Sequence, residues 1–206
     1  STPLYSSAAS DVYKRQAFLW ASCPEDLFHE SLATHGAGTS DMADRSVHYE
    51  AAFEGYLRHR GIPYVAVDEA KKALFSTAKL KSFDFVVYSK NGPNLLVDVK
   101  GRSLRDRSAR KGFETWTTEQ DVTDLSQWGQ VFGDGFTPVL SFVYWIDPPM
   151  LPEPGMYEIR ERWYPFMGVD LAEYRTHMRR RSPKWQTVCL GANDFRSIAR
   201  PLESWL

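Results

Sequence analysis

The chain has 206 residues, of which 43% are hydrophobic and 14% aromatic, enough for one sizeable core. Its net charge of −1 indicates no particular partner, so charge has to be considered locally. Cys23 and Cys189 are far apart and exclude a disulfide framework or a Cys-x-x-Cys pair. No apolar run approaches the roughly 20 residues of a membrane span, and the polar start lacks the apolar segment of a signal peptide. We therefore expect a cytoplasmic protein without a membrane partner.

The first residues are set apart from the fold prediction. They lack an initiating methionine, and residues 6–16 (SSAASDVYKRQ) resemble a translated cloning or sequencing adapter. The alternative is a disordered arm that belongs to the protein, and neither interpretation places chemistry in residues 1–16. Residues 17–206 are predicted to form a single domain, with a core over about 44–146 and a C-terminal α/β extension over about 150–206.

The core is predicted to begin with a helix that runs to about His59. Asp44 or Ser46 can cap this helix, and apolar residues recur within it at helical spacing. Gly61 and the proline two residues later are expected to end it.

Three strands are predicted after this helix. One lies at IPYVAVDEA (62–70) and the next at SFDFVVYSK (82–90), with a basic connector between them. The turn NGPN (91–94) joins the second strand to LLVDVKG (95–101), so we expect these two strands to form a hairpin.

A second helix, capped by Thr117 or Thr118, is predicted to reach about Phe132, before an apolar strand at TPVLSFVYWI (137–146). A proline-rich loop follows. The remaining residues predict a strand over MYEIRERWYPFMGV (156–169), a short helix, a basic stretch RRRSPK, another strand and a C-terminal helix. The order α-β-β-β-α-β, followed by further elements, predicts one α/β domain with a central mixed sheet flanked by helices.

The third predicted strand, LLVDVKGR (95–102), contains two charged residues although it is strongly apolar. Asp98 and Lys100 share one face because side chains alternate along a strand. Burying an unpaired charge is costly, so this face must meet water, a partner or a metal. The preceding strand contains Asp84 within another apolar run. Asp84 approaches Asp98 only if the register and twist of the hairpin bring them together, which the sequence does not fix.

These acidic residues predict a metal site. Two carboxylates held close together repel each other unless a cation lies between them, and Mg²⁺ is the natural choice for oxygen ligands. Lys100 could then orient or deprotonate a metal-bound water. Glu50 and Glu54 stack on one face of the first helix, where they either add an acid to the site or are simply solvated.

The arrangement of these residues resembles the PD-(D/E)xK nuclease superfamily. An acid on the first helix is followed by Asp84 in one strand and by Asp98-Val99-Lys100 in the next. The match covers the core, about half of the chain, although Phe83 stands where many members have proline. The string HYEAAFE (48–54) also resembles a bacterial family named for its HYExAFE motif. The superfamily implies a restriction-endonuclease-like fold.

The resemblance implies a metal-dependent endonuclease, in which strand acids bind one or two Mg²⁺ ions, with Mn²⁺ as an alternative, and a lysine positions the attacking water. Carried onto this sequence, the catalytic residues are Glu50, Asp84, Asp98 and Lys100, and the metal ligands are Asp84, Asp98, Glu50 and the carbonyl of Val99. Glu50 lies eleven residues before Gly61, a spacing similar to that in Holliday-junction-resolvase-like members, and Glu54 is its alternate.

A basic segment begins where the predicted site ends. It holds six basic residues against one acid: Lys100, Arg102, Arg105, Arg107, Arg110 and Lys111. Such residues supply most of the non-specific affinity for phosphates, so we expect those after Lys100 to bind nucleic acid. A second basic cluster at 175–184 either extends this groove or is a solvated loop.

Two functions of different class remain open. The first is hydrolysis of DNA by in-line attack of a metal-activated water on phosphorus. The alternative is a non-catalytic nucleic-acid-binding domain on the same fold, and a structural scaffold is a third option. The sequence does not separate DNA from RNA. It also leaves the oligomeric state open, although many relatives work as dimers, which makes a homodimer one candidate assembly.

Overall fold

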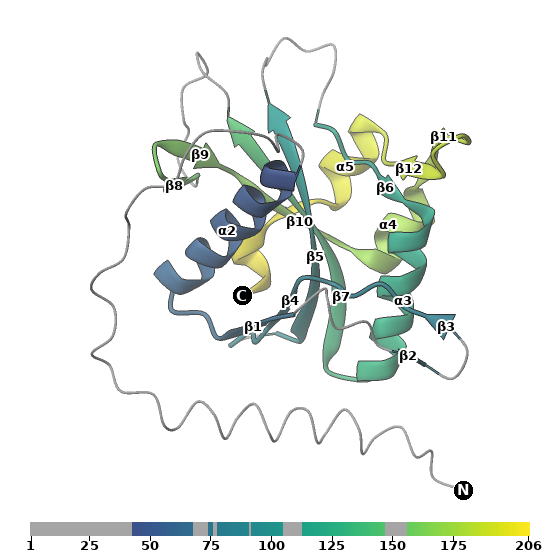
Figure 1. Ribbon diagram of the computed structural model, residues 1–206, viewed down its shortest axis with the longest axis horizontal. Helices are drawn as coiled ribbons and strands as arrows, with labels where there is room; N and C mark the ends of the chain where they lie inside the picture. The colour runs from purple at the N-terminus through teal and green to yellow at the C-terminus, as the bar shows by residue number, and fades with distance from the viewer. Residues whose placement is uncertain (1–42, 68–73, 76–77, 91, 105–112, 147–155) are drawn as a thin grey trace, which may run out of the picture. The chain divides into compact units, whose positions relative to one another are not determined.

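The computed structural model describes residues 43–67, 74–75, 78–90, 92–104, 113–146 and 156–206. The predictions for residues 1–16 lie outside this part of the chain. A central sheet separates helix α2 (Ala43–His59) from helices α3 (Glu119–Phe132), α4 (Leu171–His177) and α5 (Ala192–Ile198) (Figure 1). None of the described helices has the length and apolar character needed to cross a membrane.

Helix α2 packs on the sheet through one apolar stripe. The buried residues of this stripe recur at helical spacing and are Tyr49, Ala52, Phe53, Tyr56 and Leu57. The helix ends where Gly61 N–H donates to Arg58 O (3.0 Å) and Ile62 N–H donates to Leu57 O (2.9 Å). Gly61 has a φ of +62°, which glycine adopts without the strain that a Cβ would bring. The predicted end of this helix is therefore confirmed.

The central sheet has the strand order β1-β4-β5-β7-β10-β13. The strands in this order are β1 (Tyr64–Ala66), β4 (Phe85–Val87), β5 (Asn94–Leu104), β7 (Phe136–Ile146), β10 (Phe166–Asp170) and β13 (Arg200–Pro201), and two further strands join the sheet beside β7. Strands β1, β4 and β5 pair antiparallel, whereas β5 and β7 pair parallel, with α3 connecting them. The path α2-β1-β4-β5-α3-β7 is the α-β-β-β-α-β order of the predicted restriction-endonuclease-like core, and the fold prediction is confirmed.

Strand β5 divides two hydrophobic cores because its side chains alternate between the faces of the sheet. Leu95 and Val97 pack with the stripe of α2, and both are fully buried. Leu96 packs with residues of α3, α4 and α5 on the other face. Asp98 and Lys100 continue the face of Leu96, so their side chains start from the α3 side of the sheet.

The structure corrects the single strand predicted over 156–169. Three strands occupy this stretch: β8 (Tyr157–Ile159), β9 (Arg162–Tyr164) and β10. Strands β8 and β9 form a hairpin around Arg160 and Glu161, whose φ values are 49° and 61°. Positive φ at both turn residues is the geometry of a type I′ hairpin, and it reverses the chain here without a glycine or asparagine.

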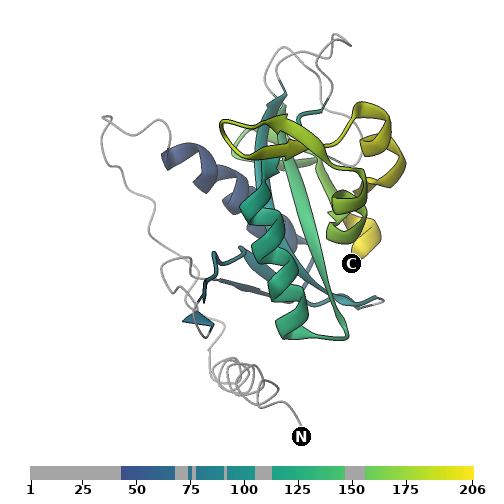
Figure 2. The same cartoon turned by 90° about the vertical axis from the view of Figure 1, so that its right-hand side faces the viewer.

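Short strands also form in two basic stretches. The connector after β1 contains the pair β2 (Leu74–Phe75) and β3 (Ala78–Lys79). The basic stretch after α4 becomes strand β11 (Arg179–Ser182), which pairs with β12 (Thr187–Cys189), and β12 pairs in turn with β6 (Thr117–Thr118). Figure 2 shows this small sheet at the end of α3 where that helix begins. The one-turn helix η1 (Leu202–Trp205) then follows β13.

Candidate active site

Asp84 lies in a bend immediately before β4, at the point where the β4–β5 ladder ends. The last paired residues of that ladder are Phe85 and Val97. Beyond them, Asp84 Oδ2 accepts a hydrogen bond from Val99 N–H at 2.5 Å, while the carbonyl of Asp84 accepts one from Val67 N–H at 2.8 Å. The Asp84 carboxylate therefore takes the place of a backbone carbonyl as the acceptor for Val99 N–H. This hydrogen bond holds the carboxyl against β5 beside Asp98.

The ion pairs of Lys100 account for the two charged residues in this apolar strand. Its Nζ lies 2.7 Å from Oδ2 of Asp98 and 3.0 Å from Oδ2 of Asp121, which belongs to α3. All three side chains are nearly buried. The two acids therefore share one buried cation, and this contact ties the first turn of α3 to β5.

Helix α3 holds Asp121 in place through its own N-terminus. Thr118 is the N-cap, and a capping box forms because Thr118 Oγ1 accepts from Asp121 N–H while Asp121 Oδ2 accepts from Thr118 N–H. Thr117 Oγ1 also donates to Asp121 Oδ2, at 2.9 Å. Asp121 was not among the predicted site residues. The spacing Thr118-x-x-Asp121 indicates a helix start, and nothing in it indicates a partner on β5.

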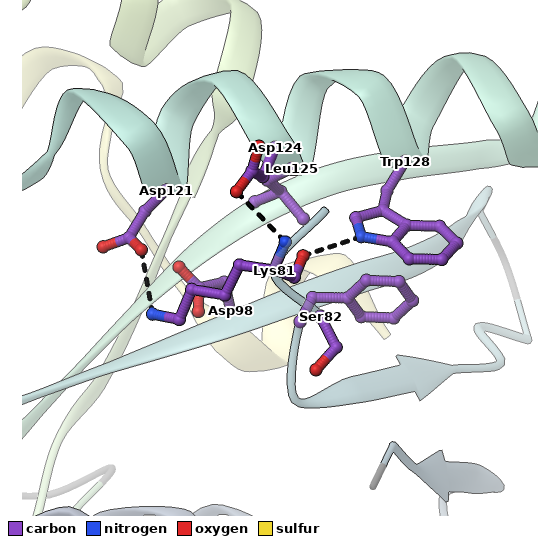
Figure 3. Close-up of a pocket in the computed structure, with 8 residues that line it drawn as sticks. Lys81, Ser82, Asp98, Asp121, Asp124, Leu125 and Trp128 are labelled. Carbon is purple, nitrogen blue, oxygen red and sulfur yellow. Dashed lines mark hydrogen bonds and ion pairs between the residues drawn. The ribbon is translucent and has the colours of Figure 1, made fainter. Parts of the chain in front are cut away.

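Lys81 adds a second cation on the same side. Its Nζ donates to Asp121 Oδ1 at 2.9 Å, and its backbone N–H donates to Asp124 Oδ2 at 3.2 Å (Figure 3). Trp128 Nε1 donates to the carbonyl of Lys81 at 2.9 Å. These residues, together with Asp98, line a pocket of about 10 Å³, which is room for about one water molecule.

The other side of the site is an acidic cleft of about 230 Å³. It is lined by Asp84 and Phe85, by Ala66 and Val67 near β1, and by Glu50, Ala51 and Glu54 of α2. Gly101 lets α2 come this close to β5, because a Cβ built there would lie 2.0 Å from Cδ2 of Tyr49. A larger residue at Gly101 would push back the helix turn that contains Glu50.

Glu50 and Glu54 have different surroundings. Glu54 Oε1 accepts hydrogen bonds from Arg58 Nη2 at 2.7 Å and from the Tyr64 hydroxyl at 2.6 Å, so it belongs to a network at the end of α2. The charge of Glu50 is one of the main causes that raise the pKa of Asp84. The charge on Glu50 therefore acts on Asp84, while Glu54, which also lines the cleft, is engaged by Arg58 and Tyr64.

Burial and like charge dominate the titration of the strand acids. Burial first, and then the charge of Asp98, raise the pKa of Asp84 to about 8, although the Val99 hydrogen bond opposes the rise. Burial also raises the pKa of Asp98, against the opposing effect of Lys100. Burial alone would lower the pKa of Lys100, but Asp98 and Asp121 outweigh it and hold that pKa above its usual value. Lys100 is therefore an ammonium at neutral pH.

The residues that could hold a divalent cation are the adjacent carboxyls of Asp84 and Asp98. Within the described residues, no group of three or more histidine, cysteine, aspartate or glutamate side chains is close enough to enclose a metal ion. Mg²⁺ does not require such a cage, because it usually keeps several waters and is held by one or two carboxylates together with substrate phosphates. Apart from its ion pair, Oδ2 of Asp98 receives no hydrogen bond from the described residues. The donor set therefore fits Mg²⁺ or Mn²⁺.

The predicted phosphate-binding segment is described only at its start. Arg105, Arg107, Arg110 and Lys111 lie outside the described residues. Arg102 is half-buried: its guanidinium donates to the carbonyls of Gly101 and Trp116 and stacks 3.9 Å from the centre of the Trp116 ring. These contacts of Arg102 are therefore with the protein, and its predicted role in phosphate binding stays a prediction.

Comparison with known proteins gives a likeness among solved structures. No protein-family model matches the chain, and no curated protein matches it. Among solved structures, the chain is similar to Hjc, a Holliday junction resolvase from the archaeal hyperthermophile Archaeoglobus fulgidus. The similarity covers 77% of this chain and 97% of that one, with 11% identity and a TM-score of 0.46. Membership of the HYExAFE family stays a prediction, and the function has to be argued from the residues of the site.

Proposed function

We propose that this protein is a metal-dependent nuclease of the PD-(D/E)xK kind, which hydrolyses phosphodiester bonds of DNA. The observation that supports this most strongly is the pair of buried carboxyls, Asp84 and Asp98, at the end of the β4–β5 ladder, with Lys100 beside them and Glu50 across the cleft. Buried like charges are costly without a cation, and a cation beside a cleft is suited to a phosphate substrate.

In this proposal Asp84 and Asp98 hold the cation, with the Val99 carbonyl and Glu50 as further ligands. When bound, a divalent cation supplies Lewis-acid chemistry at a phosphoryl oxygen. The chain's own contribution is to fix the carboxylates before the substrate arrives. Val99 N–H fixes Asp84, and Lys100 fixes Asp98.

Lys100 acts in this proposal as a cation and not as the base that deprotonates water. Its two carboxylate partners keep it protonated, so it would first have to release its own proton, and with it both ion pairs, before it could accept one from water. A fixed ammonium next to the cleft can instead orient the attacking water and stabilise negative charge that develops on the phosphoryl group. Asp121 is the positioning residue that holds Lys100 from α3.

Cleavage assays test this proposal directly. Supercoiled, linear, branched and single-stranded DNA are incubated with the protein in Mg²⁺, in Mn²⁺ and in EDTA. We expect cutting that needs a metal and that is lost in Asp98→Asn and in Glu50→Gln. Glu54→Gln, on the same helix one turn away, is the matched control and is expected to keep cutting. RNA of the same sequence separates the two nucleic acids.

The outcomes separate the two functions. Metal-dependent cutting that survives in Asp98→Asn would mean that the site is elsewhere. Tight, salt-dependent binding without any cutting would favour the non-catalytic nucleic-acid-binding domain. Equal losses in Glu50→Gln and Glu54→Gln would remove Glu50 from the site.

A further inference from the structure

The hairpin formed by β11 and β12 presents a tryptophan to solvent. Trp185, in the turn of this hairpin, is 69% exposed. Only one other large hydrophobic side chain in the described part of the chain is exposed, Phe113 at 46%, and it packs against Tyr144 with ring centres 4.8 Å apart. Leaving an indole in water forgoes the stabilisation that burial would bring. Such a side chain suggests a partner that covers it.

The surroundings of Trp185 are basic. The segment 178–188 contains four arginines or lysines beside Trp185 and no acid: Arg179, Arg180, Arg181 and Lys184. All four are exposed. Lys184 Nζ lies 5.4 Å from the centre of the Trp185 ring, and the Arg181 guanidinium lies 5.1 Å from the centre of the Trp116 ring. The one ion pair of these arginines within the described residues joins Arg180 to Glu119 at 3.5 Å. The surface is therefore aromatic and positive.

The hairpin is attached to the end of α3 that supports the site. Thr187 pairs with Thr118, the N-cap of α3, and Glu119 N–H donates to the carbonyl of Gln186 at 2.9 Å. Three residues after the cap, Asp121 contacts Lys100. One strand pair and one turn of helix therefore connect Lys100 to the turn that presents Trp185.

We propose that this hairpin turn, Lys184 to Gln186 with Arg181 beside it, is a second nucleic-acid-binding site, which takes an unpaired nucleotide. Trp185 stacks on the exposed base, and Arg181 and Lys184 contact the flanking phosphates. Stacking needs a free face of the base, which a blunt duplex does not offer along its length, whereas a single strand, a fork or a junction does. The inference rests on the proposed nuclease function and deepens it, because it names DNA with unpaired bases as the preferred substrate class.

Binding without catalysis tests the site. Fluorescence anisotropy in EDTA compares a single strand, a forked duplex and a blunt duplex, all carrying the same label. We expect Trp185→Ala to weaken binding of the single strand and the fork by at least about fivefold, the lower end of what one stacked base contributes. Binding of the blunt duplex should change less than about twofold. Trp185→Phe should retain most of the affinity, and Phe113→Ala is the matched control for loss of an exposed aromatic ring.

Salt dependence tests the phosphate contacts separately. Changing Arg181 and Lys184 together to Gln should reduce the slope of log affinity against log salt for the single strand by about 1.4, about 0.7 for each contact. If wild type binds DNA and Trp185→Ala binds each of the three probes as tightly as wild type does, this inference alone is overturned. That result would point to a protein partner for the hairpin. An equal loss on all three probes would exclude base stacking. A protein that binds none of the probes would overturn the proposed function as well.

Discussion

Replacing Asp84 by Asn should make the metal-free protein more stable at neutral and alkaline pH. The amide keeps the shape of the side chain and an oxygen that can accept from Val99 N–H. It removes a carboxyl whose pKa rises from 3.8 to about 8 in the folded protein because of burial and the charge of Asp98. Between these two values the folded protein holds a proton that the unfolded chain has released.

The sign and size of the effect follow from this difference in bound protons. Because the folded state binds more protons than the unfolded state, the free energy of unfolding falls as the pH rises. One proton gives a slope of at most about 1.4 kcal/mol per pH unit, so wild type loses at most about 3 kcal/mol through this group between pH 5 and pH 7. Below the unfolded value the stabilisation is complete, and above about pH 8 no further loss comes from Asp84. Asp84→Asn lacks this slope.

Urea unfolding in EDTA, from pH 5 to pH 9, measures the effect, because the free energy in water is extrapolated at each pH. Parallel curves for wild type and Asp84→Asn would refute the reasoning, since they would mean that Asp84 titrates alike in both states. Adding Mg²⁺ at pH 8 provides a second measurement. A ligand at 100 times its dissociation constant adds about 2.7 kcal/mol, and we expect this gain in wild type and not in Asp84→Asn.

Further substitutions test the contacts in and around the site. Lys100→Met should cost about 3–5 kcal/mol in urea unfolding, because two buried carboxylates lose their shared cation; a cost under about 1 kcal/mol would contradict the ion-pair arrangement. Gly101→Ala should destabilise by about 1–3 kcal/mol, because its Cβ meets the Tyr49 ring, and adding Tyr49→Ala should cost less than it does alone. Glu50→Gln should move the upper end of the pH-dependent loss to lower pH, and Glu54→Gln should not; equal shifts would mean that both acids act on Asp84.

The core of the fold was predictable because its signals are local. The spacing of apolar residues locates α2, and Gly61 at positive φ ends it, as a glycine before a proline predicts. The β8–β9 hairpin was not predicted because its turn lacks such a local signal. Arg160 and Glu161 take up positive φ without being glycine or asparagine, so pairing between the strands stabilises a turn that the local sequence does not encode.

The residues of the candidate site can be named from the sequence, but their geometry cannot. The sequence contains Asp84, Asp98 and Lys100, but the pairing of Phe85 with Val97 decides that the two acids meet, and a shift of one residue would separate their faces. Asp121 could not be found from spacing, because its partner Lys100 is 21 positions earlier and on another element. Tertiary packing of α3 on β5 creates that contact.

The ion pairs of the site single out Asp84. Asp98 contacts Lys100, and Asp121 contacts both Lys100 and Lys81, so each of these acids has a cation within 3.0 Å. Among the described residues, the Asp84 carboxyl receives only the Val99 N–H and contacts no cation. Burial and the charge of Asp98 raise the pKa of Asp84 to about 8, so without a bound cation the carboxyl holds a proton at neutral pH. A divalent cation that displaces this proton would bind at the strand acid that has no cation partner among the described residues, which is why Asp84→Asn tests the metal site more sharply than a change at Asp98.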